Sequence, residues 1–223
     1  MELDSIRGRI AAAGLAYRGA FHPGEDDVPA KTLVLVGFVG SGNWPGFANS
    51  PEAADGQPNP LDRWSVRIIS ALADDLGATA LFPFAEPFLP FQRWAQKAEP
   101  VHSSPLGILI HPEWGLWHAY RGALAFAEQI ALPPPDVRPS PCDSCAGKPC
   151  LNACPVEAFT SAAYDVPACV GHIGGPAGTQ CMEGGCRARR ACPVGLQYRY
   201  APHHAHFHLS AFLEAQRLFT PPA

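Results

Sequence analysis

The sequence predicts an α+β protein in two parts, a mixed α/β domain at residues 1–135 and a cysteine-rich domain at residues 136–223. Strand-like and helix-like apolar patterns alternate in the first part, while all eight cysteines lie between Cys142 and Cys192. Five prolines in residues 132–141 separate the two parts. Such a run continues neither a helix nor a central strand, so we expect a stiff connector at the domain boundary.

The mixed order of elements in the first part favours one sheet covered by helices. Residues 32–38 form a short β-rich run that is typical of a buried strand. A helix is expected from Pro60 to a stop at Gly77, with Asn59 as its N-cap, because apolar residues recur there at helical spacing. The remaining expected elements are strands at residues 78–84 and 106–110, and helices at residues 91–98 and 207–218.

Composition and charge exclude several classes of protein. The net charge of −4 argues against general nucleic-acid binding, and no apolar run reaches the roughly 18 residues of a membrane-spanning helix. The first residues include acidic side chains and lack the apolar stretch of a signal peptide, so a cytoplasmic protein is expected. Eight cysteines in such a protein indicate reduced thiols that hold metal rather than a disulfide framework.

The spacing of the cysteines is the most specific signal in the sequence. The first run is Cys142-x2-Cys145-x4-Cys150-x3-Cys154-Pro, the second is Cys181-x4-Cys186-x5-Cys192-Pro, and Cys169 lies between them. In two-cluster ferredoxins the cysteine before the proline binds the other cluster. The same crossover predicts two [4Fe–4S] clusters here, one held by Cys142, Cys145, Cys150 and Cys192 and the other by Cys154, Cys169, Cys181 and Cys186. Two structural zinc sites or ordinary buried thiols are the alternatives.

The cysteine region resembles the two-cluster module of epoxyqueuosine reductases and reductive dehalogenases, in which a lone cysteine such as Cys169 joins the second cluster. The upstream part is similar to the nitroreductase-like, corrinoid-binding domain of those enzymes and of CblC-type cobalamin-processing proteins. Three stretches carry that similarity, at residues 59–64, 90–95 and 111–121. The resemblance therefore implies a nitroreductase-like (CblC-like) domain followed by a bacterial-ferredoxin-like domain.

This resemblance implies an iron–sulfur oxidoreductase. Electrons from a flavodoxin, a ferredoxin or a similar carrier would pass through two [4Fe–4S] clusters to a corrinoid (cobalamin) or another small-molecule acceptor. Trp114 and Trp117 are candidates for stacking on the corrinoid ring, with plain core packing as the alternative. Arg121 is a candidate contact for an amide or phosphate of the corrinoid tail, with an ordinary salt bridge as the alternative.

The sequence departs from the family pattern at the position of the catalytic acid. Epoxyqueuosine reductases place an acidic proton donor before a Pro-x-Leu segment, whereas this chain has Phe84 there, with Glu86 as the nearest acid. Phenylalanine donates no proton, so epoxide reduction is not expected. The alternative functions are a non-catalytic ferredoxin-type electron carrier with a docking domain, and a zinc-stapled interaction protein.

Two further groups of side chains have two interpretations each. Arg187, Arg189 and Arg190 lie between the last two cysteines, where they either offset cluster charge or form a solvated face. The histidines near the C-terminal helix either bind a metal or pack at the entry to that helix; they are His203, His204, His206 and His208.

Overall fold

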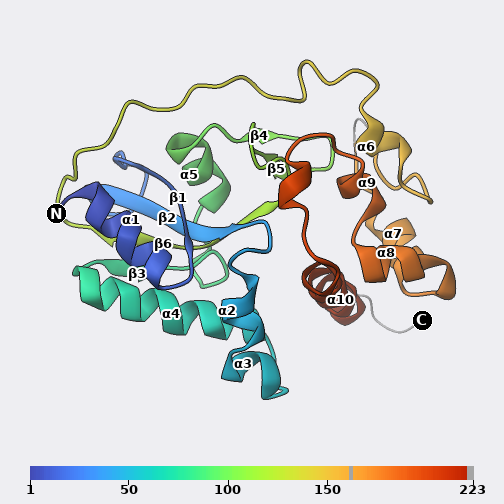
Figure 1. Ribbon diagram of the computed structural model, residues 1–223, viewed down its shortest axis with the longest axis horizontal. Helices are drawn as coiled ribbons and strands as arrows, with labels where there is room; N and C mark the ends of the chain where they lie inside the picture. The colour runs from blue at the N-terminus through green and yellow to red at the C-terminus, as the bar shows by residue number, and fades with distance from the viewer. Residues whose placement is uncertain (161–162, 220–223) are drawn as a thin grey trace. The chain divides into compact units, whose positions relative to one another are not determined.

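The computed structural model describes residues 1–160 and 163–219, which fall into two compact units (Figure 1). The first unit comprises residues 1–101 and 118–138, and the second comprises residues 102–117 together with the chain from Pro139 onward. The sequence-based boundary after residue 135 differs from this division mainly at residues 102–117. That segment groups with the cysteines, although it precedes the last strand of the first unit.

An antiparallel sheet of four strands forms the centre of the first unit, in the order β1-β2-β6-β3. Its strands are β1 (Ala16–Phe21), β2 (Thr32–Val39), β3 (Thr79–Leu81) and β6 (His118–Phe126). The strand expected at residues 32–38 is confirmed, and every one of those seven residues is buried. A strand covered on both faces reads as a continuous apolar run, which is why this one was evident in the sequence.

The long helix α4 (Pro60–Leu76) follows the expected bounds and lies against β3 and β6. Its buried side chains recur at helical spacing, and Gly77 ends it in the left-handed conformation with φ 63°. The expected cap is wrong, because Asn59 itself has φ 51° and its side chain makes no capping hydrogen bond. The other helices of this unit are α1 (Leu3–Ala12), α2 (Trp44–Ala48), α3 (Pro51–Ala54) and α5 (Phe91–Ala98).

Short helices and turns build most of the second unit. They are α6 (Pro149–Asn152), α7 (Val166–Ile173), η1 (Pro176–Gly178), α8 (Thr179–Gly184), α9 (Arg187–Arg190) and η2 (Leu196–Tyr198). One long helix, α10 (Pro202–Phe219), packs against α7 and α8 and begins five residues before the expected position. A two-stranded sheet of β4 (His102–Ser103) and β5 (Leu109–Ile110) completes the unit.

Two expected strands are much shorter than the sequence pattern predicts. The strand expected at residues 78–84 is paired only over β3, since Pro83 supplies no backbone N–H to extend the ladder. The strand expected at residues 106–110 is reduced to β5 and belongs to the small sheet of the second unit. The mixed α and β content of the prediction is confirmed.

Two glycines allow the backbone of the segment 102–117 to pack closely against the rest of the second unit. A Cβ on Gly115 would lie 2.2 Å from the carbonyl oxygen of Val194, and a Cβ on Gly195 would lie 2.4 Å from the carbonyl carbon of Trp114. Only residues without side chains allow the two backbones to approach this closely. The same segment contributes Leu106, Ile110 and Leu116 to a core that also contains Cys150, Cys192 and Ala188.

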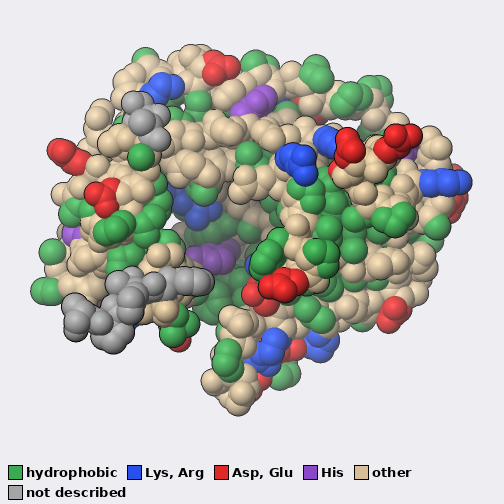
Figure 2. Space-filling model, turned by 180° about the vertical axis from the view of Figure 1, so that it is seen from behind, with side chains coloured by type: hydrophobic (Ala, Val, Ile, Leu, Met, Phe, Trp, Pro, Cys, Tyr) green, Lys and Arg blue, Asp and Glu red, His purple; other side chains and the backbone are tan. Residues whose placement is uncertain are grey.

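Charged residues make up 16% of the chain, and Figure 2 shows them as separate groups among apolar and neutral surface on the face that it draws. In the described part of the chain, no helix combines the length and the apolar character needed to cross a membrane.

Candidate functional site

Four cysteines line one apolar cavity of about 290 Å³ in the second unit, hereafter the cysteine cavity; they are Cys154, Cys169, Cys181 and Cys186. Cys169 lies on α7, which is started by the Asp165 carboxylate accepting a hydrogen bond from the Ala168 amide at 2.9 Å. Cys181 lies on α8, and Cys186 directly precedes α9. Cys154 follows α6, so segments at four separate helices bring these thiols to one place.

The sulfur atoms of the cysteine cavity have polar neighbours. The backbone N–H of Ala158 donates to the sulfur of Cys154 at 3.4 Å, and a ring nitrogen of His172 lies 3.8 Å from the sulfur of Cys181. Burial raises the pKa of Cys169, and a hydrogen bond from Tyr164 lowers it in part. Donors of this kind stabilise negative charge on sulfur, which a bound cluster would carry.

The remaining four cysteines gather around a second position in the same unit; they are Cys142, Cys145, Cys150 and Cys192. Cys150 and Cys192 are buried in one core cluster, with Cys142 packed against it. Burial raises the pKa of Cys142, and the neighbouring Cys192 and Cys150 thiols raise it further, while the Lys148 ammonium acts in the opposite direction. Four soft donors thus share one buried neighbourhood here as well.

These two groups are the same sets of four as the pairing expected from the crossover spacing. All eight thiols are free of disulfide bonds in the structure. Among residues 1–160 and 163–219, no three His, Cys, Asp or Glu side chains meet at the spacing of a single metal ion. The arrangement gives each set donors of one chemical type, and sulfur is the type that iron–sulfur clusters require.

An aromatic and cationic stack lies beside the cysteine-bearing helices of the second unit. The Arg189 guanidinium lies 4.7 Å from the ring centre of Trp117 and 4.5 Å from that of Tyr200, and it donates to the Leu116 carbonyl. Tyr200 in turn stacks on His204 at 3.8 Å. His204 is fully buried, and burial, followed by the charges of neighbouring cations, lowers its pKa to about 2.

The histidine tract is therefore divided between packing and surface positions. His204 and His208 approach each other with their Nε2 atoms 3.1 Å apart, and His206 contacts the Met182 carbonyl through Nδ1. His203 is exposed. The packing interpretation describes His204, which stays neutral at ordinary pH because of its burial.

The three candidate corrinoid contacts have partners within the protein. Trp117 is 3% exposed and lies against Tyr200, while Trp114 stacks on His111 with 3.9 Å between the ring centres. Arg121 belongs to the first unit, where it pairs with the Asp62 carboxylate, donates to Ser65 at 2.9 Å and lies 5.5 Å from the ring of Phe84. The salt-bridge interpretation of Arg121 thus agrees with its contacts.

Comparison with solved structures finds similarity to epoxyqueuosine reductases. Epoxyqueuosine reductase from Streptococcus thermophilus matches with a TM-score of 0.51 and 14% identity, over 87% of this chain and 66% of that one. The shared feature is the fold. A selenomethionine-labelled epoxyqueuosine reductase matches with a TM-score of 0.48 and 15% identity, over 92% of this chain and 62% of that one.

This chain therefore spans somewhat less than two thirds of the length of those structures. No protein-family model and no curated protein matches it. The structural likeness supports a mixed helix and strand fold like that of epoxyqueuosine reductase.

Sequence reasoning missed the polar neighbours of the cysteine cavity, above all Tyr164 and His172. Their only sequence signal is proximity to Cys169, five residues after Tyr164 and three before His172. That proximity acquires meaning only in the fold, where Tyr164 precedes α7 and reaches Cys169, and His172 on α7 reaches Cys181.

Proposed function

We propose that this protein is an iron–sulfur oxidoreductase whose second unit holds two [4Fe–4S] clusters, one in each set of four cysteines. The observation that carries the proposal is the cysteine cavity, because four thiols that are distant in sequence line one apolar space. Its volume of about 290 Å³ is far larger than a single metal ion, which favours a cluster over zinc.

The donor chemistry of the cysteine cavity fits such a group. Burial raises the pKa of Cys169 and Cys186, and the adjacent thiols raise it further. Four thiolates are therefore stable together only around a cationic metal core. Apolar side chains such as Ile173, Leu209 and Phe212 complete the wall and keep water from the sulfur atoms.

Clusters of this type supply one-electron storage when bound. The residues of this chain provide the polar groups that surround the cysteine sulfur atoms. The Ala158 N–H, Tyr164 and His172 lie against cysteine sulfurs, where hydrogen bonding favours the reduced, more negative state. The cysteines hold the geometry and take no part in bond making.

The sequence resemblance implies that the first unit binds the electron acceptor, which would be a corrinoid or another small molecule. The residues named for the corrinoid do not favour it, because Trp117 is buried under Arg189 and Arg121 is paired with Asp62. We therefore derive no step through a corrinoid. Phe84 lies under Arg121 and leaves no carboxyl group at the position of the family's acid, so epoxide reduction is excluded from the proposal.

Cobalamin titration tests the acceptor separately. A spectral shift to the base-off form would support a corrinoid-linked reductase. An unchanged cobalamin spectrum at high protein excess would contradict the corrinoid and favour the non-catalytic electron carrier.

Anaerobic purification with iron, sulfide and zinc analysis tests the clusters themselves. We expect brown protein with broad visible absorption and about eight irons per chain, four for each set. Cys169→Ser and Cys145→Ser should each remove about half of the iron, because they alter different sets, whereas Ser144→Ala in the same loop as Cys145 should remove none. A colourless protein that contains zinc, or no metal, would refute the proposal, and iron unchanged by Cys169→Ser would refute the pairing.

A further inference from the structure

A second hollow of the cysteine-bearing unit is open and lined by arginine. It measures about 710 Å³, and three guanidinium groups, those of Arg187, Arg190 and Arg199, face it together with the single carboxylate of Glu183. We refer to it as the arginine hollow. Within residues 1–160 and 163–219, none of these three arginines forms an ion pair, whereas Arg18, Arg63, Arg67 and Arg121 of the first unit are each paired with Asp or Glu.

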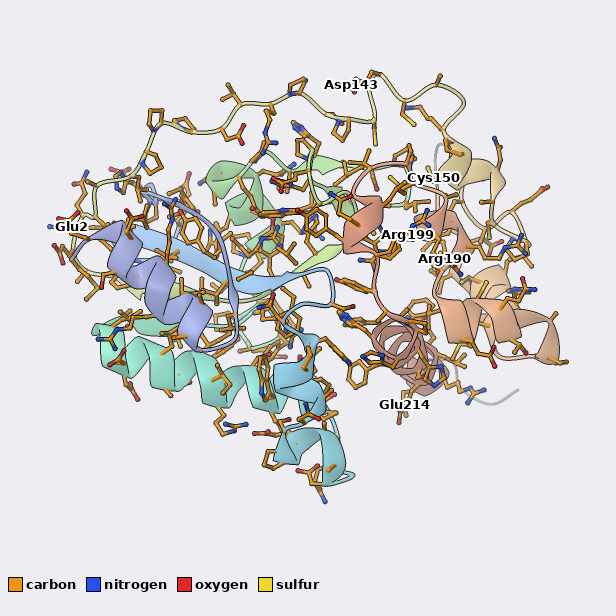
Figure 3. All side chains as sticks on the ribbon, in the orientation of Figure 1. Glu2, Asp143, Cys150, Arg190, Arg199 and Glu214 are labelled. Atoms are coloured by element: carbon orange, nitrogen blue, oxygen red, sulfur yellow. The ribbon has the colours of Figure 1, made fainter. Side chains whose placement is uncertain are left out.

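The arginine hollow has a defined construction. Arg199 donates to the backbone carbonyl of Arg190, and Figure 3 shows the two labelled side by side in this unit. A Cβ on Gly184 would lie 2.5 Å from a guanidinium nitrogen of Arg190, so the side chain lies directly against that glycine. The third member of the run, Arg189, points elsewhere and covers Trp117. Helix α9 thus separates a half-buried arginine from two exposed ones.

The wall of the arginine hollow touches both cysteine sets. Its lining residues Ala153 and Arg187 are the immediate sequence neighbours of Cys154 and Cys186, which line the cysteine cavity. Ala191 adjoins Cys192 of the other set. The positive charge of Arg199 also acts on the Cys192 thiol, which confirms that the two groups are near in space. A molecule seated in this hollow would lie next to both proposed clusters.

The openness of the hollow indicates a protein rather than a small ligand. Small-molecule sites enclose most of their ligand, whereas this space is open to solvent, and the three arginines that line it are exposed. Protein electron-transfer complexes are small, transient and steered by complementary charge. Electron transfer weakens steeply with distance, so a donor protein has to approach close to a cluster.

We propose, on the basis of the proposed function, that the arginine hollow is the docking surface for an acidic protein electron donor. Each encounter passes one electron from the donor, which is oxidised, to this protein, which is reduced. No bond forms and no proton is transferred.

Stopped-flow reduction of the cluster-loaded protein tests this proposal. The donor is a reduced, acidic plant-type [2Fe–2S] ferredoxin, and the second-order rate is measured from low to high salt. The triple variant Arg187→Gln/Arg190→Gln/Arg199→Gln should react at least roughly tenfold more slowly at low salt and lose most of its salt dependence. Arg217→Gln, which removes an exposed charge from α10, is the matched control and should change the rate little.

Two further measurements separate docking from other effects. Reduction by methyl viologen radical, a small cation that needs no docking surface, should not slow in the triple variant. The triple lysine variant keeps the charges and should retain most of the ferredoxin rate. Equal slowing with viologen would assign the arginines to the cluster potential, and an unchanged ferredoxin rate would overturn the proposal.

Iron content is measured on every sample before kinetics. A wild-type protein without iron would refute the proposed function, whereas an iron-loaded triple variant that reacts like the wild type would refute only the docking surface. RNA that binds the wild type and not the triple variant, with the ferredoxin rate unchanged, would assign the hollow to nucleic acid instead and overturn the proposal.

Discussion

Replacing Arg18 with methionine should destabilise the first unit by about 3–5 kcal/mol, because it leaves a buried carboxylate without its partner. Arg18 is fully buried, and its guanidinium contacts a Glu99 carboxylate oxygen at 2.5 Å and the Phe38 carbonyl at 3.0 Å. Glu99 is 8% exposed and also accepts a hydrogen bond from Tyr120. Removal of Arg18 takes away the cation that pairs with Glu99 and leaves the negative charge in the core.

Urea unfolding at pH 7 measures this defect through fluorescence of the buried tryptophans of the first unit, which are Trp44, Trp64 and Trp94. The control is Arg9→Met, which breaks an exposed ion pair with Asp75 and should cost less than about 1 kcal/mol. A similar cost for both variants would refute the reasoning.

Three other outcomes are expected. Burial lowers the pKa of His204 to about 2 from an ordinary 6.5, so between these pH values only the unfolded chain binds a proton at this histidine. The free energy of unfolding of the wild type, measured by urea titration, should therefore fall by about 2 kcal/mol from pH 7 to pH 5, and His204→Gln should remove that loss. Gly195→Ala should cost about 2–4 kcal/mol, from a φ of 69° and a clash with Trp114, whereas Gly147→Ala, with the same φ and open space, should cost only about 1–2 kcal/mol. Removing iron with a chelator should make the second unit sensitive to trypsin and leave the first resistant; equal resistance before and after would contradict a structural role for the metal.

Periodicity and local chemistry predicted the elements whose apolar residues repeat cleanly. The helix α4 and the strand β2 are such cases. Strands β1 and β6 were missed, since Arg18 is buried inside β1, and β6 contains Gly122 and a run of small residues that blurs alternation. A buried arginine looks like a surface residue until its partner is known.

The candidate site likewise has one part that the sequence predicted and one part that it did not. Spacing alone grouped the cysteines, because the crossover rule depends on sequence distance, and the structure has the same groups. It did not distinguish Arg189, which turns inward, from Arg187 and Arg190, which face the arginine hollow. That difference depends on the orientation of the four-residue helix α9, and the sequence of those four residues alone does not determine this orientation.

The chain leaves the first unit after Val101, contributes residues 102–117 to the second, and then returns to form β6, whose neighbours β2 and β3 are already made. A cut at the proline-rich connector would therefore leave the second unit incomplete, because residues 102–117 would stay with the amino-terminal piece. The carboxy-terminal fragment would lack the core residues Leu106, Ile110 and Leu116, so the second unit should be produced for spectroscopy with both pieces together. Ribosomal synthesis cannot finish the first unit before it has begun the second.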